Sequence, residues 1–227
     1  MTGPIILELD AARPSRFDAP LSLRLAAGEF ALIETPDPSR SAAFADLCTG
    51  LVNLADGMVR FLGRDWKGLP HEHAAAMRGR IGRVFGREGG WVGFIDVATS
   101  VLLPQLHHTR RPAGTLRDDA TALARRFGLP GLPLDRPNGV ASDDLSRAAC
   151  VRAFLGEPLL LLLESPARGW LDDMLPPLLD ALAVARDRGA AAIWLAPGDR
   201  IWRDRSVPAT YRYRLQEQGL IQVRPRS

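Results

Sequence analysis

Residues 28–51 read GEFALIETPDPSRSAAFADLCTGL, and this stretch decides the fold of the chain. The apolar run from Phe30 to Ile33 predicts a buried strand, and the prolines at 36 and 38 predict a turn after it. Apolar residues then recur at helical spacing, which predicts a helix with one buried face. They are Ala42, Phe44, Ala45, Leu47 and Cys48.

Strand, tight turn and helix in this order are the layout of a phosphate-binding loop. In such loops backbone amides and a helix N-terminus hold phosphates, and a lysine neutralises them. The only lysine of this chain is Lys67, well outside the stretch. The layout is therefore present, but the residue types for that chemistry are missing.

Length and composition predict an ordinary globular protein, with one domain and a modest subdomain. The chain has 227 residues, 46% of them hydrophobic and 24% charged, which is typical of proteins with a substantial core. The formal net charge of +3 is too small to predict a nucleic-acid partner. Arginines are densest in two stretches, which are read as solvated faces or, alternatively, as contacts to an anionic membrane surface or acidic partner. These are Arg110 and Arg111, and the tail with Arg212, Arg214, Arg224 and Arg226.

Several kinds of site and segment are not expected. Cys48 and Cys150 sit in apolar helical patterns, as buried hydrophobes do. The histidines form two pairs, at 71 and 73 and at 107 and 108. Neither pair has a third or fourth ligand at useful spacing, so no metal site is predicted. Apolar runs such as 159–163 are too short to span a bilayer, and no basic, apolar leader opens the chain. We therefore expect a cytoplasmic protein.

The rest of the chain alternates strand and helix patterns, which predicts an open, mostly parallel α/β sheet. Strands are expected at 5–9, 21–25, 57–62, 81–85 (at the centre of the sheet), 159–163 and 190–195, with a terminal hairpin over 211–223 turning at 218–219. Helices are expected at 70–79, 97–106, 116–127, 143–155 and 171–188. Ligands of such sheets bind at the carboxyl ends of strands, which points to the loop after Ile33.

The order of these segments resembles the ATP-binding cassette of ABC transporters over nearly the whole chain. Its most specific part is VRAFLGEPLLLLLESP at 151–166, which is similar to the family's helix, Gly-Asp-Pro turn, Walker B strand and Glu-Pro. The resemblance implies a P-loop NTPase-like cassette with a mostly parallel core sheet, an antiparallel β part and a helical subdomain. It makes 1–227 one domain, with 1–86 and 156–227 as the core and 87–155 as the helical subdomain.

The family's phosphate loop, G-P-x-G-S-G-K-S/T, falls on 35–43 of this chain and is degenerate there. Pro38 removes a backbone donor and Asp37 adds a negative charge. Ser41 stands at the lysine position, and Arg40 supplies a charge without the amide nest. The window's candidate positions are Thr35, Pro38, Ser39, Arg40, Ser41 and Ala42.

The family's other motifs change as well. Gly86 falls at the position of the family's Q-loop glutamine, and Pro197 falls at the position of its switch histidine. Glu164 falls at the magnesium-binding aspartate and could keep that ability, while Ser165 falls at the general base and cannot accept a proton from water at neutral pH. The signature motif corresponds to Val140, Ala141, Ser142, Asp143 and Asp144. Two carboxylates there would repel a triphosphate.

These losses lead to the hypothesis of a pseudo-ATPase with no catalytic residue, no metal site and no bound ATP or Mg²⁺, unless the site functions unexpectedly. The resemblance implies a membrane permease and a second cassette as partners, with the protein peripheral at the inner face of the cytoplasmic membrane. The stretches RGRIGRVF and DVATSVLLPQLHH are faintly similar to cassettes of lipid-handling MCE or lipid-asymmetry transporters, which would make lipid the cargo.

The stretch after Gly86 is the expected permease-docking surface, because the family's coupling helix inserts beside this loop. Its apolar side chains could form a groove. They are Trp91, Val92, Phe94, Leu102 and Leu103. The alternative is that they close the subdomain's own core.

Three other functions stay open at this point. One is an active ABC ATPase with a non-standard nucleotide site. Another is a soluble regulatory protein that uses the cassette fold without a permease. The third is a different α/β nucleotide or cofactor binder, although the chain has no G-x-G-x-x-G.

Overall fold

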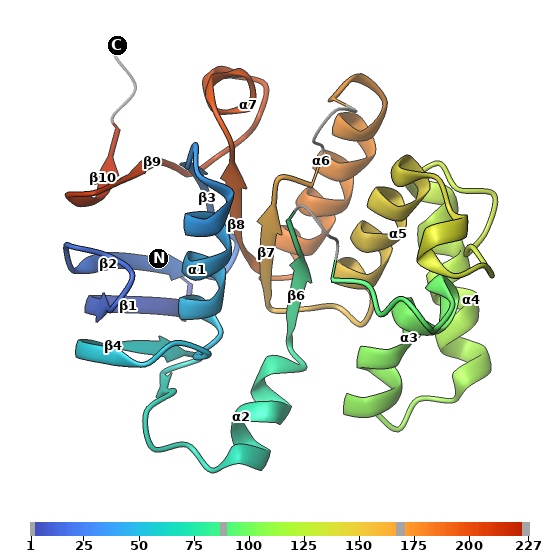
Figure 1. The fold of residues 1–227 in the computed structure, drawn as a ribbon, viewed down its shortest axis with the longest axis horizontal. Coiled ribbons are helices and arrows are strands. Elements are labelled where there is room, and N and C mark those ends of the chain that lie inside the picture. The colour runs from blue at the N-terminus through green and yellow to red at the C-terminus, as the bar shows by residue number, and fades with distance from the viewer. Residues whose placement is uncertain (1–2, 87–89, 167–170, 224–227) are drawn as a thin grey trace.

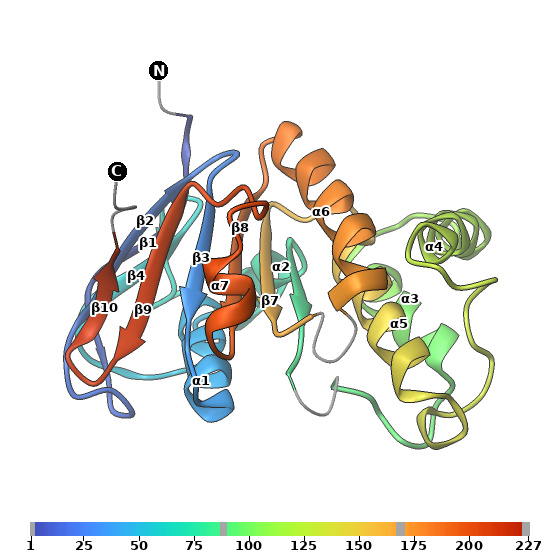
Figure 2. The same ribbon diagram turned by 90° about the horizontal axis from the view of Figure 1, so that it is seen from above.

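The computed structural model describes residues 3–86, 90–166 and 171–223, without the side chains of residues 171, 172 and 199. An antiparallel sheet, a mostly parallel sheet and a group of helices follow one another across the molecule (Figure 1). Seen from above, helices α3, α4 and α5 gather on the side away from the antiparallel sheet (Figure 2). The predicted fold class is confirmed. The predicted domain boundary at residue 87 lies outside the described residues.

The antiparallel sheet has the strand order β2-β1-β4-β5. Its strands are β1 (Ile5–Pro14), β2 (Leu21–Ala26), β4 (Leu54–Phe61) and β5 (Arg64–Asp65). Buried and exposed residues alternate along β2, as its sequence pattern predicts for a half-buried strand. The short strand β5 has no sequence signal of its own, because it forms only by pairing back onto β4.

The second sheet has the order β10-β9-β3-β8-β7-β6. Its strands are β3 (Phe30–Glu34), β6 (Ile81–Val84), β7 (Leu160–Glu164), β8 (Ala191–Ala196), β9 (Tyr211–Gln216) and β10 (Gly219–Gln222). Neighbouring strands are parallel except for β9 and β10, which form the predicted terminal hairpin. Gly219 pairs with Gln216, so residues 217 and 218 make the turn, one position earlier than predicted.

The prediction of a central position for β6 was wrong, since β6 is the edge strand beside β7. Its apolar pattern arises instead because helix α5 (Ser142–Phe154) packs against it. A Cβ built on Gly82 of β6 would lie 1.9 Å from the backbone oxygen of Ala153 in α5. An edge strand that is covered by a helix can be as apolar as a central one.

The other helices cover the sheets and the ends of strands. They are α1 (Pro38–Cys48), α2 (His71–Arg78), α3 (Val97–His108), α4 (Ala113–Arg126), α6 (Leu171–Asp187) and α7 (Asp199–Arg203), with a 3₁₀ turn at Pro137–Gly139. The sequence indicated all but α7 and the 3₁₀ turn, which are each at most five residues long. No helix in the described ranges is long and apolar enough to cross a bilayer.

The parallel sheet separates two hydrophobic cores, because successive side chains of a strand point to opposite faces. In β7, Leu160 and Leu162 join α1 and the antiparallel sheet, whereas Leu161 and Leu163 join the helices α3 to α6. Burial on both faces explains why 159–163 is an unbroken leucine run. It also fixes β7, and the carboxylate at its end, rigidly in the middle of the molecule.

The close approach of β6 and α5 makes Gly82 sensitive to substitution. Gly82→Ala would force its Cβ against a backbone oxygen, so we expect a loss of about 2–3 kcal/mol in unfolding free energy, measured by urea denaturation. Gly93→Ala is the matched control, because nothing lies within 4 Å of the added Cβ, and it should change stability by less than about 0.5 kcal/mol. Equal effects of the two substitutions would contradict this packing.

Candidate functional site

The carboxyl ends of parallel strands bring most of the sequence-predicted site residues together. Thr35 follows β3, Gly86 follows β6, Ser165 follows β7 and Pro197 follows β8. Backbone hydrogen bonds hold these ends in register: the Thr35 N–H donates to the Ala196 oxygen at 2.9 Å, and the Ser165 N–H to the Leu195 oxygen at 3.0 Å. The structure therefore places the candidate site where open α/β sheets bind ligands.

At the start of α1, a carboxylate of the chain itself caps the helix. Asp37 is the N-cap residue, and its Oδ1 accepts a hydrogen bond from the Ser39 N–H at 2.8 Å. Its Oδ2 accepts the Ser39 hydroxyl at 2.8 Å. These hydrogen bonds hold the pKa of the Asp37 carboxyl below its ordinary value, so it is ionised at neutral pH. A negative charge thus already stands where the helix dipole would attract a phosphate.

The rest of the loop turns its polar groups inward or sideways. Thr35 is fully buried, and its hydroxyl donates to the Asp37 carbonyl at 3.2 Å. Ser41, at the position expected for the family's lysine, is 4% exposed, and its hydroxyl lies 3.4 Å from the same carbonyl. Arg40 points to Glu217 after β9, with 4.0 Å between their charged atoms. No side chain of this loop therefore aims a positive charge at the end of the helix.

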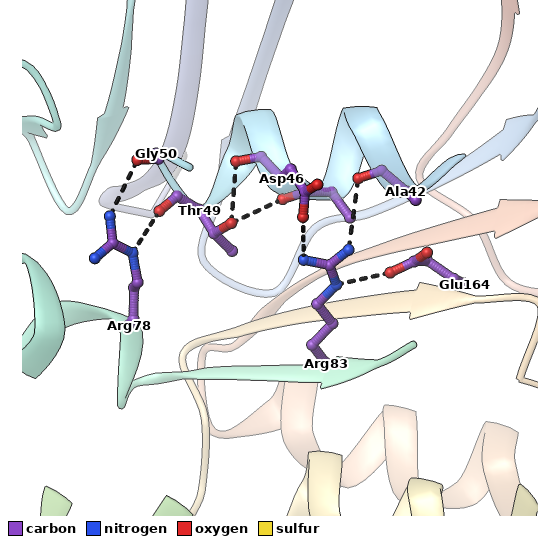
Figure 3. A network of polar contacts seen from close by, with 8 residues as sticks. Ala42, Asp46, Thr49, Gly50, Arg78, Arg83 and Glu164 are labelled. Carbon is purple, nitrogen blue, oxygen red and sulfur yellow. Dashed lines mark hydrogen bonds and ion pairs between the residues drawn. The ribbon is translucent and has the colours of Figure 1, made fainter. Parts of the chain in front are cut away.

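A cation from β6 occupies the middle of the site (Figure 3). Arg83 Nε donates to Glu164 Oε1 at 2.7 Å, and Nη1 donates to Asp46 Oδ1 at 2.6 Å. Nη2 lies 3.5 Å from the Ala42 carbonyl oxygen. Arg83 is only 11% exposed and Glu164 3%, so this is a buried ion pair that joins β6, β7 and α1.

A second arginine closes the other end of α1. Arg78, at the end of α2, donates to the backbone oxygens of Thr49 and Gly50 at 2.9 and 3.0 Å (Figure 3). Carbonyls at a helix C-terminus have no partner within the helix, and a cation there also suits the dipole. Both arginines therefore fix α1 to the segment 71–84.

Opposing effects act on the Glu164 carboxyl. Burial raises its pKa above the ordinary value, while the positive charge of Arg83 and its hydrogen bond act to lower it. Gly86 lies beside this carboxyl, since a Cβ there would be 3.5 Å from Glu164 Oε2. Ser165 follows with a φ of 51°, in the left-handed region that residues other than glycine rarely adopt.

The predicted signature residues lie away from this edge. Ala141 caps the start of α5, and Asp143 and Asp144 stand in its first turn, on the helical side of the molecule (Figure 2). The Ser142 hydroxyl bonds to Asp143 Oδ1 at 3.0 Å. Pro197 is exposed after β8. Within one chain, the predicted signature residues therefore do not meet the predicted phosphate loop.

A cavity of about 380 Å³ lies between the core and the helices, beside the Arg83 cluster. It is lined from the core side by α1, α2 and β6 and from the helical side by α3 and α5. Val92 and Leu103, two of the predicted docking residues, line it, and both are at least 39% exposed. Phe94 is 75% exposed, and Trp91 is half-buried.

Leu102 corrects the predicted docking surface. It is only 3% exposed and belongs to the core formed with α4, α5 and the sheet. Successive residues of α3 point to different sides, so Leu103 faces the cavity when Leu102 faces inward. The alternative reading, closure of the subdomain's own core, thus holds for Leu102.

Sequence reasoning missed the residues at the centre of the site. Arg83 lies within the strand predicted at 81–85 and Asp46 within the helix predicted after the prolines, but the sequence analysis singled out neither. A charge at the third position of IGRVF, next to a buried strand, was the available signal, because a buried arginine needs a carboxylate partner. Its partners are 37 and 81 positions away in the sequence, so no local pattern could identify them.

Comparisons with known proteins agree with the resemblance. No family model matches the chain. It is 24% identical over 146 residues to the macrolide export ATP-binding/permease protein MacB of Chlorobium luteolum, covering 64% of this chain and 22% of that protein. It is 26% identical over 151 residues to the intermembrane phospholipid transport system ATP-binding protein MlaF of Haemophilus influenzae, covering 66% and 56%. The chain thus spans about a fifth and about half of these relatives.

The fold has a close counterpart among solved structures. The dimeric structure of MJ0796, a bacterial ABC transporter cassette, superposes with a TM-score of 0.83 over 98% of this chain and 100% of that one, at 16% identity. The resemblance to ABC transporter ATP-binding proteins is therefore confirmed in sequence, and the cassette fold in structure.

The residues at this edge do not suit the ATP and Mg²⁺ that the cassette fold implies. A phosphate at the start of α1 would meet the ionised Asp37, and Pro38 offers it no N–H. A metal ion at Glu164 would have to displace or repel the guanidinium of Arg83. In the described part of the chain, no three His, Cys, Asp or Glu side chains are grouped so that they could hold a metal ion.

The Arg83–Glu164 pair predicts a specific pH dependence. Arg83→Met removes the positive charge that opposes the rise of the Glu164 pKa, so that pKa should climb further. A carboxyl with a raised pKa in the folded state contributes stability at acid pH and loses it as pH rises. We expect the variant to be about 3 kcal/mol less stable than wild type near neutral pH, with a smaller deficit near pH 5, measured by urea unfolding across this range.

The control for this prediction is Glu164→Gln in the Arg83→Met background. The double variant lacks the titrating group, so its stability deficit should no longer grow between acid and neutral pH. A deficit of Arg83→Met that is the same at every pH would contradict the assignment of the effect to Glu164.

Proposed function

We propose that this chain is a non-hydrolysing ATP-binding-cassette subunit that supports or regulates a membrane transport assembly through its docking surfaces. The observation that carries the proposal is the internal charge balance of the site. Asp37 supplies the anion at the start of α1, and Arg83 supplies the cation at Glu164. The folded chain thus meets, with its own side chains, the electrostatic demands that a nucleotide and a metal ion meet in active cassettes.

The residues at the catalytic positions support the same proposal. Ser165, at the position of the general base, has a hydroxyl that is not a base at neutral pH. Ser41 replaces the phosphate-binding lysine and is buried. Each change alone would weaken catalysis, and together they remove both proton abstraction and neutralisation of the phosphates.

The relatives suggest the kind of assembly. One is named as an ATP-binding/permease protein and the other as the ATP-binding protein of a phospholipid transport system, while the solved cassette is dimeric. We infer for this chain a membrane permease and a second cassette as partners, a place at the inner face of the cytoplasmic membrane, and lipid as the class of cargo.

The cavity between core and helices is the proposed docking site for the permease. Its apolar rim includes Leu51, Val92 and Leu103, which are at least 39% exposed. Arg78, Arg83 and Arg152 also line it, and among the described lining residues Asp46 supplies the one carboxylate. A short partner helix with apolar side chains and a carboxylate would complement this lining.

Nucleotide titration tests the proposed loss of activity. We expect the purified chain with labelled ATP and Mg²⁺ to show neither saturable binding nor phosphate release above a blank without protein. Added to a co-expressed cassette, it should contribute no binding or phosphate release beyond that cassette's own. An intact cassette in the same assay is the positive control. Tight binding with turnover that disappears in Glu164→Ala would instead establish an active ATPase with a non-standard site.

Exposed residues allow a matched test of docking. Leu103→Glu places a charge on the cavity wall, so we expect its affinity for a co-expressed permease to fall at least about tenfold in a pull-down titration. Leu134→Glu is the control, because Leu134 is 73% exposed and does not line the cavity. Purification of the wild type with soluble partners alone would favour a regulatory protein that works without a permease.

A further inference from the structure

The carboxylate site and the cavity share residues. Arg83 and Asp46 form the ion-pair cluster with Glu164, and both also line the cavity. Phe85 lines the same cavity, two residues beyond Arg83 at the end of β6. The charge cluster at the sheet edge and the wall of the cavity are therefore parts of one contact system.

Aromatic and guanidinium groups continue this system to the helical side. The Arg83 guanidinium carbon lies 4.5 Å from the centre of the Phe85 ring, and that of Arg152 lies 5.4 Å from it. Arg152 belongs to α5, and its guanidinium lies 4.4 Å from the centre of the Trp91 ring. Its Nη1 donates to the Gly90 carbonyl at 3.1 Å. The order of contacts is Glu164, Arg83, Phe85, Arg152 and Trp91, from strand β7 to the segment that precedes α3.

The packing along this row of contacts is tight. A Cβ on Gly90 would lie 2.8 Å from the Phe85 ring, and Gly90 has a φ of 60°, so both space and backbone conformation favour glycine there. Burial lowers the pKa of Arg152 to about 10, which still leaves it charged at neutral pH. A stacked cation between two rings is directional, so a shift of one member displaces the next.

We propose that Arg83 is a positioning residue: its pairing with the Glu164 carboxylate sets the arrangement of the side chains that line the docking cavity. Because its guanidinium is covalently part of the chain, the cavity wall is held in one arrangement without nucleotide or metal. This inference rests on the proposed function, since it makes partner binding independent of ATP. It differs from that function in naming the residues that keep the cavity formed.

Fluorine NMR of the full chain labelled with 5-fluorotryptophan tests the inference, because Trp91 is the last member of the row. Its resonance is assigned with Trp91→Phe. In Arg83→Met and in Glu164→Gln we expect the Trp91 resonance to move by more than its linewidth, although Phe85 and Arg152 stand between Arg83 and Trp91 in the row. Trp194, buried in the core on the helical face of the sheet, should keep its position and reports that the fold is intact.

A second ion pair of the chain provides the matched control. Arg60 Nη1 lies 3.1 Å from Glu8 Oε2 in the antiparallel sheet, outside the cavity lining. Arg60→Met should leave the Trp91 resonance unchanged. Arg83→Lys keeps the charge but loses the planar fork, so it should produce a smaller shift than Arg83→Met.

The outcomes separate the inference from the proposed function. An unmoved Trp91 resonance in both Arg83→Met and Glu164→Gln, with Trp194 in place, would overturn the inference. If Arg83→Met unfolds, Glu164→Gln and Arg83→Lys decide it in the same way. A shift of wild-type Trp91 on addition of ATP and Mg²⁺ would overturn nucleotide independence and contradict the proposed function, even with the link through Arg83 intact.

Discussion

The buried ion pair of Arg83 and Glu164 is the interaction on which the rest of this structure depends. A carboxylate that is 3% exposed at the end of a fully buried strand needs a cation, and the adjacent edge strand β6 supplies it. That requirement fixes β6 beside β7 and draws α1 in through Asp46.

The chain has the fold of a cassette. At the sheet edge where such folds bind ligands, charged groups of the chain pair with other groups of the same chain. Folding requires the leucine strand, the two cores and the strand order, and all of these are present. At the edge, a helix N-terminus still attracts an anion and a buried carboxylate still attracts a cation. In this chain, Asp37 caps the helix start and Arg83 pairs with the buried carboxylate.

Sequence patterns predicted the elements well and their arrangement less well. Periodicity located the long helices and the strands, because burial imposes a period of 3.6 or 2 on the residues themselves. It misplaced β6 at the centre of the sheet, since a strand covered by a helix has the same apolar pattern as one covered by strands. Short elements such as β5 and α7 escaped because pairing and chain reversal, more than residue periodicity, produce them. Leu102 was assigned to the wrong side of α3 because a helical run of apolar residues does not show which face meets the core.

The sequence by itself determined the class of fold and the absence of the usual phosphate-loop residues, because both are carried by consecutive residues in one short stretch. It also located the start of α1, where Asp37 and Ser39 are close enough in the chain to form a cap. Only the tertiary structure decided which charged groups meet at the sheet edge. Arg83, Asp46 and Glu164 are separated by 37 and 81 positions, and they meet only because parallel strands end at a common edge. The attraction between two buried charges depends on how close their side chains are in space, and folding brings these side chains together.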